Sequence, residues 1–174
     1  MVNKKMEVPY VCSYCGKRHA GLPMDFAFNA PYYWTDELAE KDPVNNFINT
    51  DMCVIGGRDF FVRGVIEIPV LDNDETFNWG VWVSLRKENF KRYFEVYGTQ
   101  DELREKPYFG WLSNEIPIYP KTLNIKTHVH LQGNTLRPKI ELDHSNDHPL
   151  CQEQHTGISM ARVHEIIEAM ERVS

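Results

Sequence analysis

The segment CSYCGKRH at residues 12–19 is the part of the sequence most typical of metal chemistry. Cys12 and Cys15 stand three positions apart, and Gly16 permits the tight turn that brings both thiols to one side. Structural zinc takes four protein ligands, so this turn supplies half of a site. The pattern therefore predicts a zinc knuckle whose remaining ligands lie elsewhere in the chain.

Several residues are candidates for the remaining ligands. His19 is the nearest third ligand, and Cys53 is preferred as the fourth over Cys151, His148 and His155. Cys53 stands where the first predicted strand begins, after an irregular segment that can fold back upon it. Such a set has no open coordination position, so zinc would be structural, not catalytic. The expected metal ligands are Cys12, Cys15, His19 and Cys53.

Two other readings of the cysteine pair remain open. The thiols can be ordinary reduced cysteines at a turn, or they can form a thioredoxin-like redox pair. A redox motif normally opens a helix after a strand of a parallel sheet, whereas the segment 16–23, GKRHAGLP, does not continue as a helix. The sequence therefore favours zinc over redox activity.

A second chemical feature is a polar face on the predicted strands. His128 and His130 project together from one strand because their spacing is two, while the opposite face is apolar. Such a face can bind an anionic or polar ligand, another protein, or a second copy of the chain in a homodimer. A plain solvated sheet face explains the same alternation. The candidate ligand-binding residues are Arg63, Glu67, Trp82, His128, His130 and Arg137.

The loop DHSNDHP at residues 143–149 brings two histidines and two aspartates together. It can supply acid and base or ligate a hard metal, but such a run is also ordinary turn chemistry before Pro149 at a helix start. No phosphate-binding glycine loop and no serine nucleophile elbow occurs. We therefore expect a non-catalytic binding or protein-interaction domain. The alternative is a metal-assisted hydrolase that uses the strand histidines and this loop.

The strands and helices expected from the sequence position these residues. Together they indicate an α+β fold, with an antiparallel sheet packed by helices gathered on one face. We expect one domain over residues 1–174, with an irregular N-terminal segment at 10–50, strands and one helix over 51–143, and C-terminal helices at 149–173. The clearest antiparallel pair is 122–132 with 135–143.

Hydrophobic alternation assigns the faces of these strands. Residues Phe77, Trp79, Val81, Val83 and Leu85 should face the core, as should Leu136 in a later strand, which leaves Trp82 on the exposed side. A helix that ends at Gly98 should bury the stripe Phe90, Tyr93, Phe94 and Tyr97, and Ser159 should cap the last helix.

The overall composition is that of a folded protein that does not bind nucleic acid. The 174 residues are 42% hydrophobic and 25% charged, and the formal net charge is -6. Binding to a phosphate backbone needs clustered Lys and Arg, which this balance does not favour. The sequence shows no apolar run of the roughly 20 residues that a membrane helix needs, and no signal peptide is expected. We expect a cytoplasmic protein with reduced thiols.

The order of several blocks is similar to a bacterial family called domain of unknown function 2199. The blocks are CSYCGKRHAGLP, DMCVI, FFVRGVIEIPV, FNWGVWVSL, YFGWL, LRPKIEL and DHPLCQEQHTGIS, and the resemblance covers residues 10–170. The family has no established activity, so the resemblance implies no mechanism. Its C-x-x-C-G-x-x-x-H start and its D-x-C block imply that Cys12, Cys15, His19 and Cys53 act together. The family more usually has alanine at the position of Cys151, which leaves Cys151 outside the set.

Overall fold

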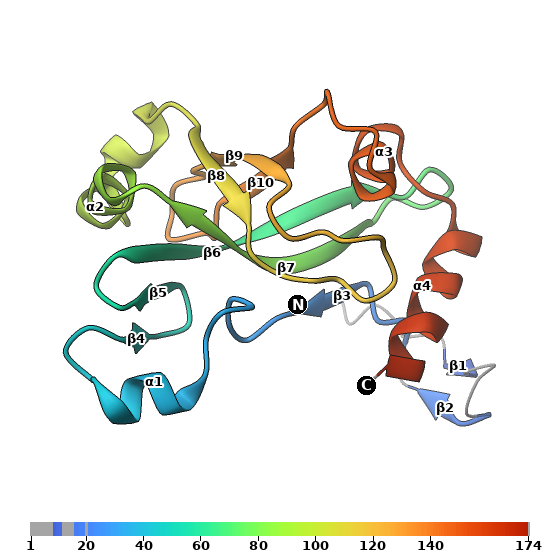
Figure 1. Cartoon of the computed structure of the whole chain (residues 1–174). Coiled ribbons are helices and arrows are strands. Elements are labelled where there is room, and N and C mark those ends of the chain that lie inside the picture. The colour runs from blue at the N-terminus through green and yellow to red at the C-terminus, as the bar shows by residue number, and fades with distance from the viewer. Residues whose placement is uncertain (1–8, 12–15, 20, 174) are drawn as a thin grey trace, which may run out of the picture.

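The computed structural model describes residues 9–11, 16–19 and 21–173 (Figure 1). Its helices are α1 (Asp36–Lys41), α2 (Lys87–Val96), α3 (Pro149–Thr156) and α4 (Met160–Val173), with a short 3-10 helix at Gln100–Arg104. Its strands are β1 (Tyr10–Val11), β2 (Arg18–His19), β3 (Asp25–Ala27), β4 (Phe47–Ile48), β5 (Met52–Ile55), β6 (Asp59–Pro69), β7 (Thr76–Leu85), β8 (Tyr108–Leu112), β9 (Lys126–His130) and β10 (Lys139–Leu142).

Strands β6 to β10 close into a five-stranded barrel. The long β6–β7 hairpin is followed by β8, β9 and β10 in antiparallel order, and β10 returns to pair with β6. A closed ring with an odd number of strands must contain a parallel pair, because directions that alternate around it cannot all match. That pair is β10–β6, with Lys139 opposite Val65. The expected combination of helices with a sheet is therefore confirmed, and the expected antiparallel sheet is partly right, because most pairs are antiparallel but the sheet is mixed.

Gly64 lies at this closing seam. A Cβ atom built on Gly64 would stand 2.5 Å from Cδ1 of Ile140 and 2.9 Å from the carbonyl oxygen of Pro138. The backbone amide of the next residue, Val65, donates to that same carbonyl at 2.9 Å. Glycine is required here because only a residue without a side chain lets β10 approach β6 closely enough to bond.

The interior of the barrel follows the predicted alternation. The alternating residues of β7 from Phe77 to Leu85 are buried, as are Ile66 and Ile68 of β6. Val163, Ile166 and Ile167 of α4 are also buried within the main core cluster. The predicted cap of α4 is confirmed, because the backbone amide of Arg162 donates to Oγ of Ser159 at 3.1 Å.

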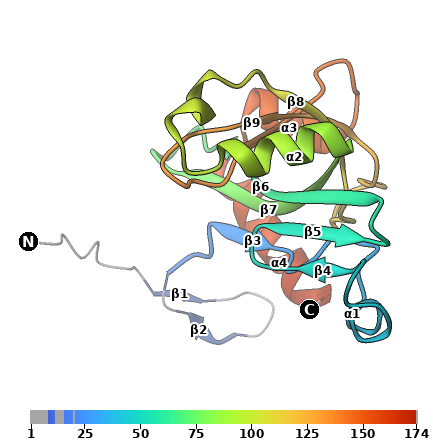
Figure 2. The same ribbon diagram turned by 90° about the vertical axis from the view of Figure 1, so that its left-hand side faces the viewer.

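The helices do not gather on one face as expected. Helices α2 and α3 lie on one side of the β6–β7 hairpin, and α1 and α4 lie on the other (Figure 2). Two predicted core residues are also exposed. Leu136 is 53% exposed because it precedes β10 in a loop, and Phe94 is 67% exposed because α2 turns Val96 inward instead.

Trp82 is the largest correction, because it is fully buried. The N-terminal segment covers its face of the sheet: indole Nε1 of Trp82 donates to the carbonyl of Phe28 at 3.0 Å. Trp82 forms a second, smaller core cluster with Cys53 and Phe61, against which Trp34 also packs. Alternation separates the two faces of a strand, but it does not show whether another segment covers the second face.

Candidate functional site

The predicted polar face is present on the outside of the barrel. Lys139 of β10 lies opposite His130 of β9, and Glu141 lies opposite His128. These four residues are half-buried or exposed, and they alternate with buried residues of the same strands. The expectation that these side chains share one polar face is therefore confirmed.

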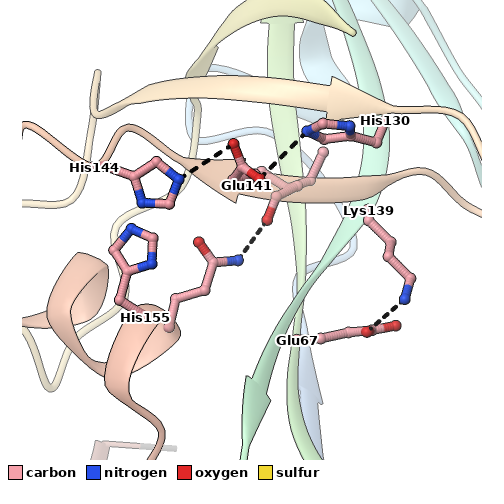
Figure 3. A pocket seen from close by; sticks show the side chains of 8 residues that line it. Glu67, His130, Lys139, Glu141, His144 and His155 are labelled. Atoms are coloured by element: carbon pink, nitrogen blue, oxygen red, sulfur yellow. Dashed lines mark hydrogen bonds and ion pairs between the residues drawn. The ribbon is translucent and has the colours of Figure 1, made fainter.

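A cavity of about 380 Å³ opens on this face, at the point where β10 leaves β6 (Figure 3). We call it the histidine cavity. Its walls come from β6, β9, β10, the loop after β10, and α3. The lining residues are Glu67, His130, Lys139, Ile140, Glu141, His144, Gln154 and His155.

Gln154 of α3 fixes the wall of the cavity by binding the open edge of β10. β10 pairs with β6 at a single register position, so the backbone beyond Lys139 has no strand partner on that side. The side-chain amide of Gln154 takes that place. Its Oε1 accepts from the backbone amide of Leu142 at 2.8 Å, and its Nε2 donates to the carbonyl of Ile140 at 2.7 Å. These two bonds attach α3 to the barrel and place His155 beside the opening.

The charged side chains of the cavity are paired with one another. Nζ of Lys139 lies 2.9 Å from Oε2 of Glu67. Glu141 lies between two imidazoles (Figure 3). Its Oε2 is 3.6 Å from Nε2 of His130, and its Oε1 is 3.6 Å from Nε2 of His144. Nε2 of His130 is buried and has no hydrogen-bond partner, although the rest of its ring is partly exposed. Lys139 and Glu67 thus compensate each other, Glu141 adds a carboxylate beside the imidazoles, and Nε2 of His130 is a buried nitrogen without a hydrogen-bond partner.

His144 and His155 form the flat side of the cavity. Their rings stack with centroids 3.5 Å apart and an angle of 18° between their planes. One ring comes from the loop after β10 and the other from α3, so the stack closes the space between these two elements.

Two other histidines of the predicted chemistry do not line the cavity. The ring of His128 lies 6.4 Å from the ring of Phe109, on β8. His148 caps α3: its Nδ1 accepts from the backbone amide of Leu150 at 3.1 Å, and its Nε2 therefore donates to the carbonyl of Pro120 at 3.0 Å. The 143–149 loop thus contributes only His144 to the cavity, while most of its polar groups form turn and cap bonds.

The remaining predicted face residues, Arg63 on β6, Trp82 on β7 and Arg137 in the loop before β10, lie away from the cavity. Trp82 is buried beneath Arg63, whose guanidinium carbon lies 5.9 Å from the centroid of the indole ring. Arg137 donates from Nε to Oδ1 of Asp51 at 2.9 Å. Of the six predicted residues, the structure brings only Glu67 and His130 into the histidine cavity. Arg63 lines a second cavity of about 630 Å³, between β6 and the N-terminal segment, which we call the arginine cavity.

The family model described as "Uncharacterized protein conserved in bacteria (DUF2199)" matches residues 11–158. The chain belongs to the DUF2199 family. No curated protein and no solved structure matches the chain. The range matched to DUF2199 includes every residue that lines the histidine cavity, whereas α4 lies beyond it. No helix in the described ranges of this DUF2199 chain is long and apolar enough to cross a membrane.

The cysteines of this DUF2199 chain are described only in part. Cys12, Cys15 and the side chain of His19 lie outside the described residues. Cys53 is fully buried beside Phe61, and burial raises the pKa of its thiol to about 12. The strands β2 and β5, which carry His19 and Cys53, lie well apart in both ribbon views (Figures 1 and 2). Within the described ranges, no group of three or more His, Cys, Asp or Glu is arranged to hold a metal ion. The zinc site stays a prediction.

Six residues of the histidine cavity lie outside the predicted ligand-binding face: Lys139, Ile140, Glu141, His144, Gln154 and His155. Lys139 and Glu141 are on the predicted polar face, so alternation alone was a sufficient signal for them. The sequence carries no comparable signal for Gln154 and His155, because their position depends on how α3 packs against an open strand edge.

Proposed function

We propose that this DUF2199 protein is a non-catalytic binding domain that holds a small polar ligand in the histidine cavity. The observation that carries this proposal is a cavity of about 380 Å³ whose charged side chains are already paired. This volume lies within the range of roughly 300–1,000 Å³ typical of small-molecule sites. Because Lys139 compensates Glu67 and Glu141 is a further carboxylate of the lining, the ligand should be neutral or zwitterionic rather than anionic, with donors and acceptors of its own.

The lining residues support binding without covalent chemistry. Among the described residues that line the cavity there is no serine, threonine, cysteine or tyrosine. The usual hydroxyl and thiol nucleophiles are therefore missing from its walls. The stacked rings of His144 and His155 offer a flat surface for a planar part of the ligand, and Nε2 of His130 offers a buried hydrogen-bonding atom.

A metal-assisted hydrolase is the second candidate, and one observation favours it. Glu141 lies between His130 and His144, and a carboxylate that orients imidazoles is a common arrangement for acid and base catalysis. In this case a bound compound would be converted to product when a divalent metal is added. A binding domain would release it unchanged.

The test is a screen of small polar metabolites by thermal shift and ligand-observed NMR, with and without added zinc. A compound that binds the wild type should lose roughly tenfold or more in affinity in H155A and E141Q, which corresponds to about 1.4 kcal/mol. H128A is the matched control, because His128 is a half-buried histidine of the same sheet that does not line the cavity. Equal affinity in wild type, H155A and E141Q would refute the assignment of the cavity, and turnover would favour the hydrolase.

The proposal includes a structural zinc ion at Cys12 and Cys15, in a cytoplasmic protein. Its support is the C-x-x-C-Gly spacing, together with the reducing cytosol that keeps such thiols available for metal. Metal analysis of the purified protein should give close to one zinc per chain, and the C12S/C15S double variant should lose it. C151S is the matched control, and C53S tests the fourth ligand. Wild-type protein that remains zinc-free after exposure to zinc would refute this part.

A further inference from the structure

Arg63 is a guanidinium without an anionic partner. In the described part of the chain, no carboxylate forms an ion pair with it. The nearest candidate, Asp51, is bonded to Arg137 at 2.9 Å. Arg63 makes one long bond, from Nη1 to the carbonyl of Thr50 at 3.4 Å, and its Nε is buried without a partner. The side chain as a whole is half-buried, so the unpaired atom is this one N–H donor, and a ligand that accepts from it would remove the cost of leaving it unbonded.

The surroundings of Arg63 increase this imbalance. The ring of Trp82 lies beneath its guanidinium, and the N-terminal segment covers that part of the sheet. Burial lowers the pKa of Arg63, the neighbouring guanidinium of Arg137 lowers it further, and Asp51 opposes both effects. Two arginines thus share Asp51, which forms its ion pair with Arg137 and leaves Arg63 without a direct carboxylate contact in the described part of the chain.

The arginine cavity has the shape and chemistry to receive an anion. It is an open depression of about 630 Å³ next to Arg63, lined by the polar residues Thr50 and Asn49 and by the apolar side chains of Trp34 and Ile48. Asp36 stands at the same cavity and accepts a bond from Nε1 of Trp34 at 3.1 Å. This carboxylate disfavours a doubly charged group such as phosphate. A single carboxylate matches the planar fork of an arginine and carries less charge toward Asp36 than phosphate does.

We propose that the arginine cavity binds the carboxylate of a small organic acid, which pairs with Arg63 while its apolar body packs against Trp34 and Ile48. This site is separate from the histidine cavity. Arg63 and Glu67 are four residues apart on β6, which corresponds to about 13 Å along the strand. The two cavities thus open on the same outer face of β6 and bind ligands of different charge.

The test is an NMR titration of the full chain with benzoate, with acetate and inorganic phosphate as comparison probes. The indole Nε1–H signals of Trp34 and Trp82 are the reporters, and those of Trp79 and Trp111 are internal references, since neither lines the arginine cavity. Benzoate should shift the reporters saturably and bind more tightly than acetate. Phosphate binding more tightly than benzoate would overturn the carboxylate assignment.

Variants decide whether Arg63 is responsible. R63Q should weaken benzoate at least roughly tenfold, the loss expected when a charged hydrogen-bond partner is removed. R63K keeps the positive charge but loses the planar fork, so its affinity for benzoate should lie between those of the wild type and R63Q. R63K also replaces R63Q in the test if R63Q does not fold. R58Q is the matched control, because Arg58 is exposed and lies outside the cavity. H155A should bind benzoate with the affinity of the wild type, whether or not it loses affinity for ligands of the histidine cavity. No saturable shift, or an affinity in R63Q and R63K equal to that of the wild type, would overturn the proposal.

Discussion

Replacing Gln154 with leucine tests how the barrel holds α3 and forms the wall of the histidine cavity. The change removes two hydrogen bonds, of 2.8 and 2.7 Å, from the open edge of β10. It leaves the amide of Leu142 and the carbonyl of Ile140 unpaired, in residues that are almost fully buried. A shielded backbone group without a partner costs about 1–3 kcal/mol, and the apolar leucine regains part of this. We expect Q154L to lower the free energy of unfolding by about 2–4 kcal/mol.

Urea unfolding followed by tryptophan fluorescence measures this loss, because Trp79 and Trp82 are fully buried. With a slope of about 1–3 kcal/mol/M, the midpoint should fall by about 1–2 M. Q152L is the matched control: Gln152 is exposed on the same helix and makes one long bond to the carbonyl of Asp147, so it should change stability by less than about 0.5 kcal/mol. If Q154L and Q152L are equally stable, Gln154 does not replace a strand partner and the account of the cavity wall is wrong.

Two further predictions concern charge and thiols. Arg92 and Tyr108 donate hydrogen bonds to Glu105 and hold the pKa of the Glu105 carboxyl below its ordinary value of 4.5. The ionised Glu105 therefore contributes fully to stability above pH 4.5, and this contribution is lost as the pH falls through the lowered pKa. Urea midpoints should therefore show a constant difference between wild type and E105Q from pH 7 to about 5 that shrinks as the pH falls below 4.5. A difference that instead grows in acidic buffer would contradict this. Burial raises the pKa of Cys53 to about 12 and of Cys151 to about 11. A thiol reagent should therefore leave both cysteines unmodified at neutral pH until the chain unfolds. Rapid modification of either cysteine in the folded protein, located by mass spectrometry, would contradict their burial.

The features that the sequence predicts well are those that depend on neighbouring residues. The faces of β6, β7, β9 and β10 follow from a period of two, and the cap at Ser159 follows from the residue before a helix. The polar face that carries His130 and Glu141 was located in this way. These signals are local because each depends on backbone geometry within one element.

The features that the sequence does not predict depend on contacts between distant segments. The barrel closes through one register pair, Lys139 opposite Val65, and nothing in either strand alone indicates the other. Gln154 and His155 join the site only because α3 docks on the open edge of β10. Trp82 is buried because the segment around Phe28 covers it. In each case a local pattern is compatible with several tertiary partners.

The same row of outward residues on β6 therefore serves two different sites, and charge balance distinguishes them. At one end, Glu67 has Lys139 as its partner, so a ligand there meets neutral surroundings and must offer both donors and acceptors. At the other end, Arg63 is covered by the N-terminal segment and lacks a partner, so a ligand there must bring a negative charge. Alternation places both residues on one face, but it does not distinguish a paired charge from an unpaired one. That distinction comes from what covers each end of the strand, and it determines which ligand each cavity can bind.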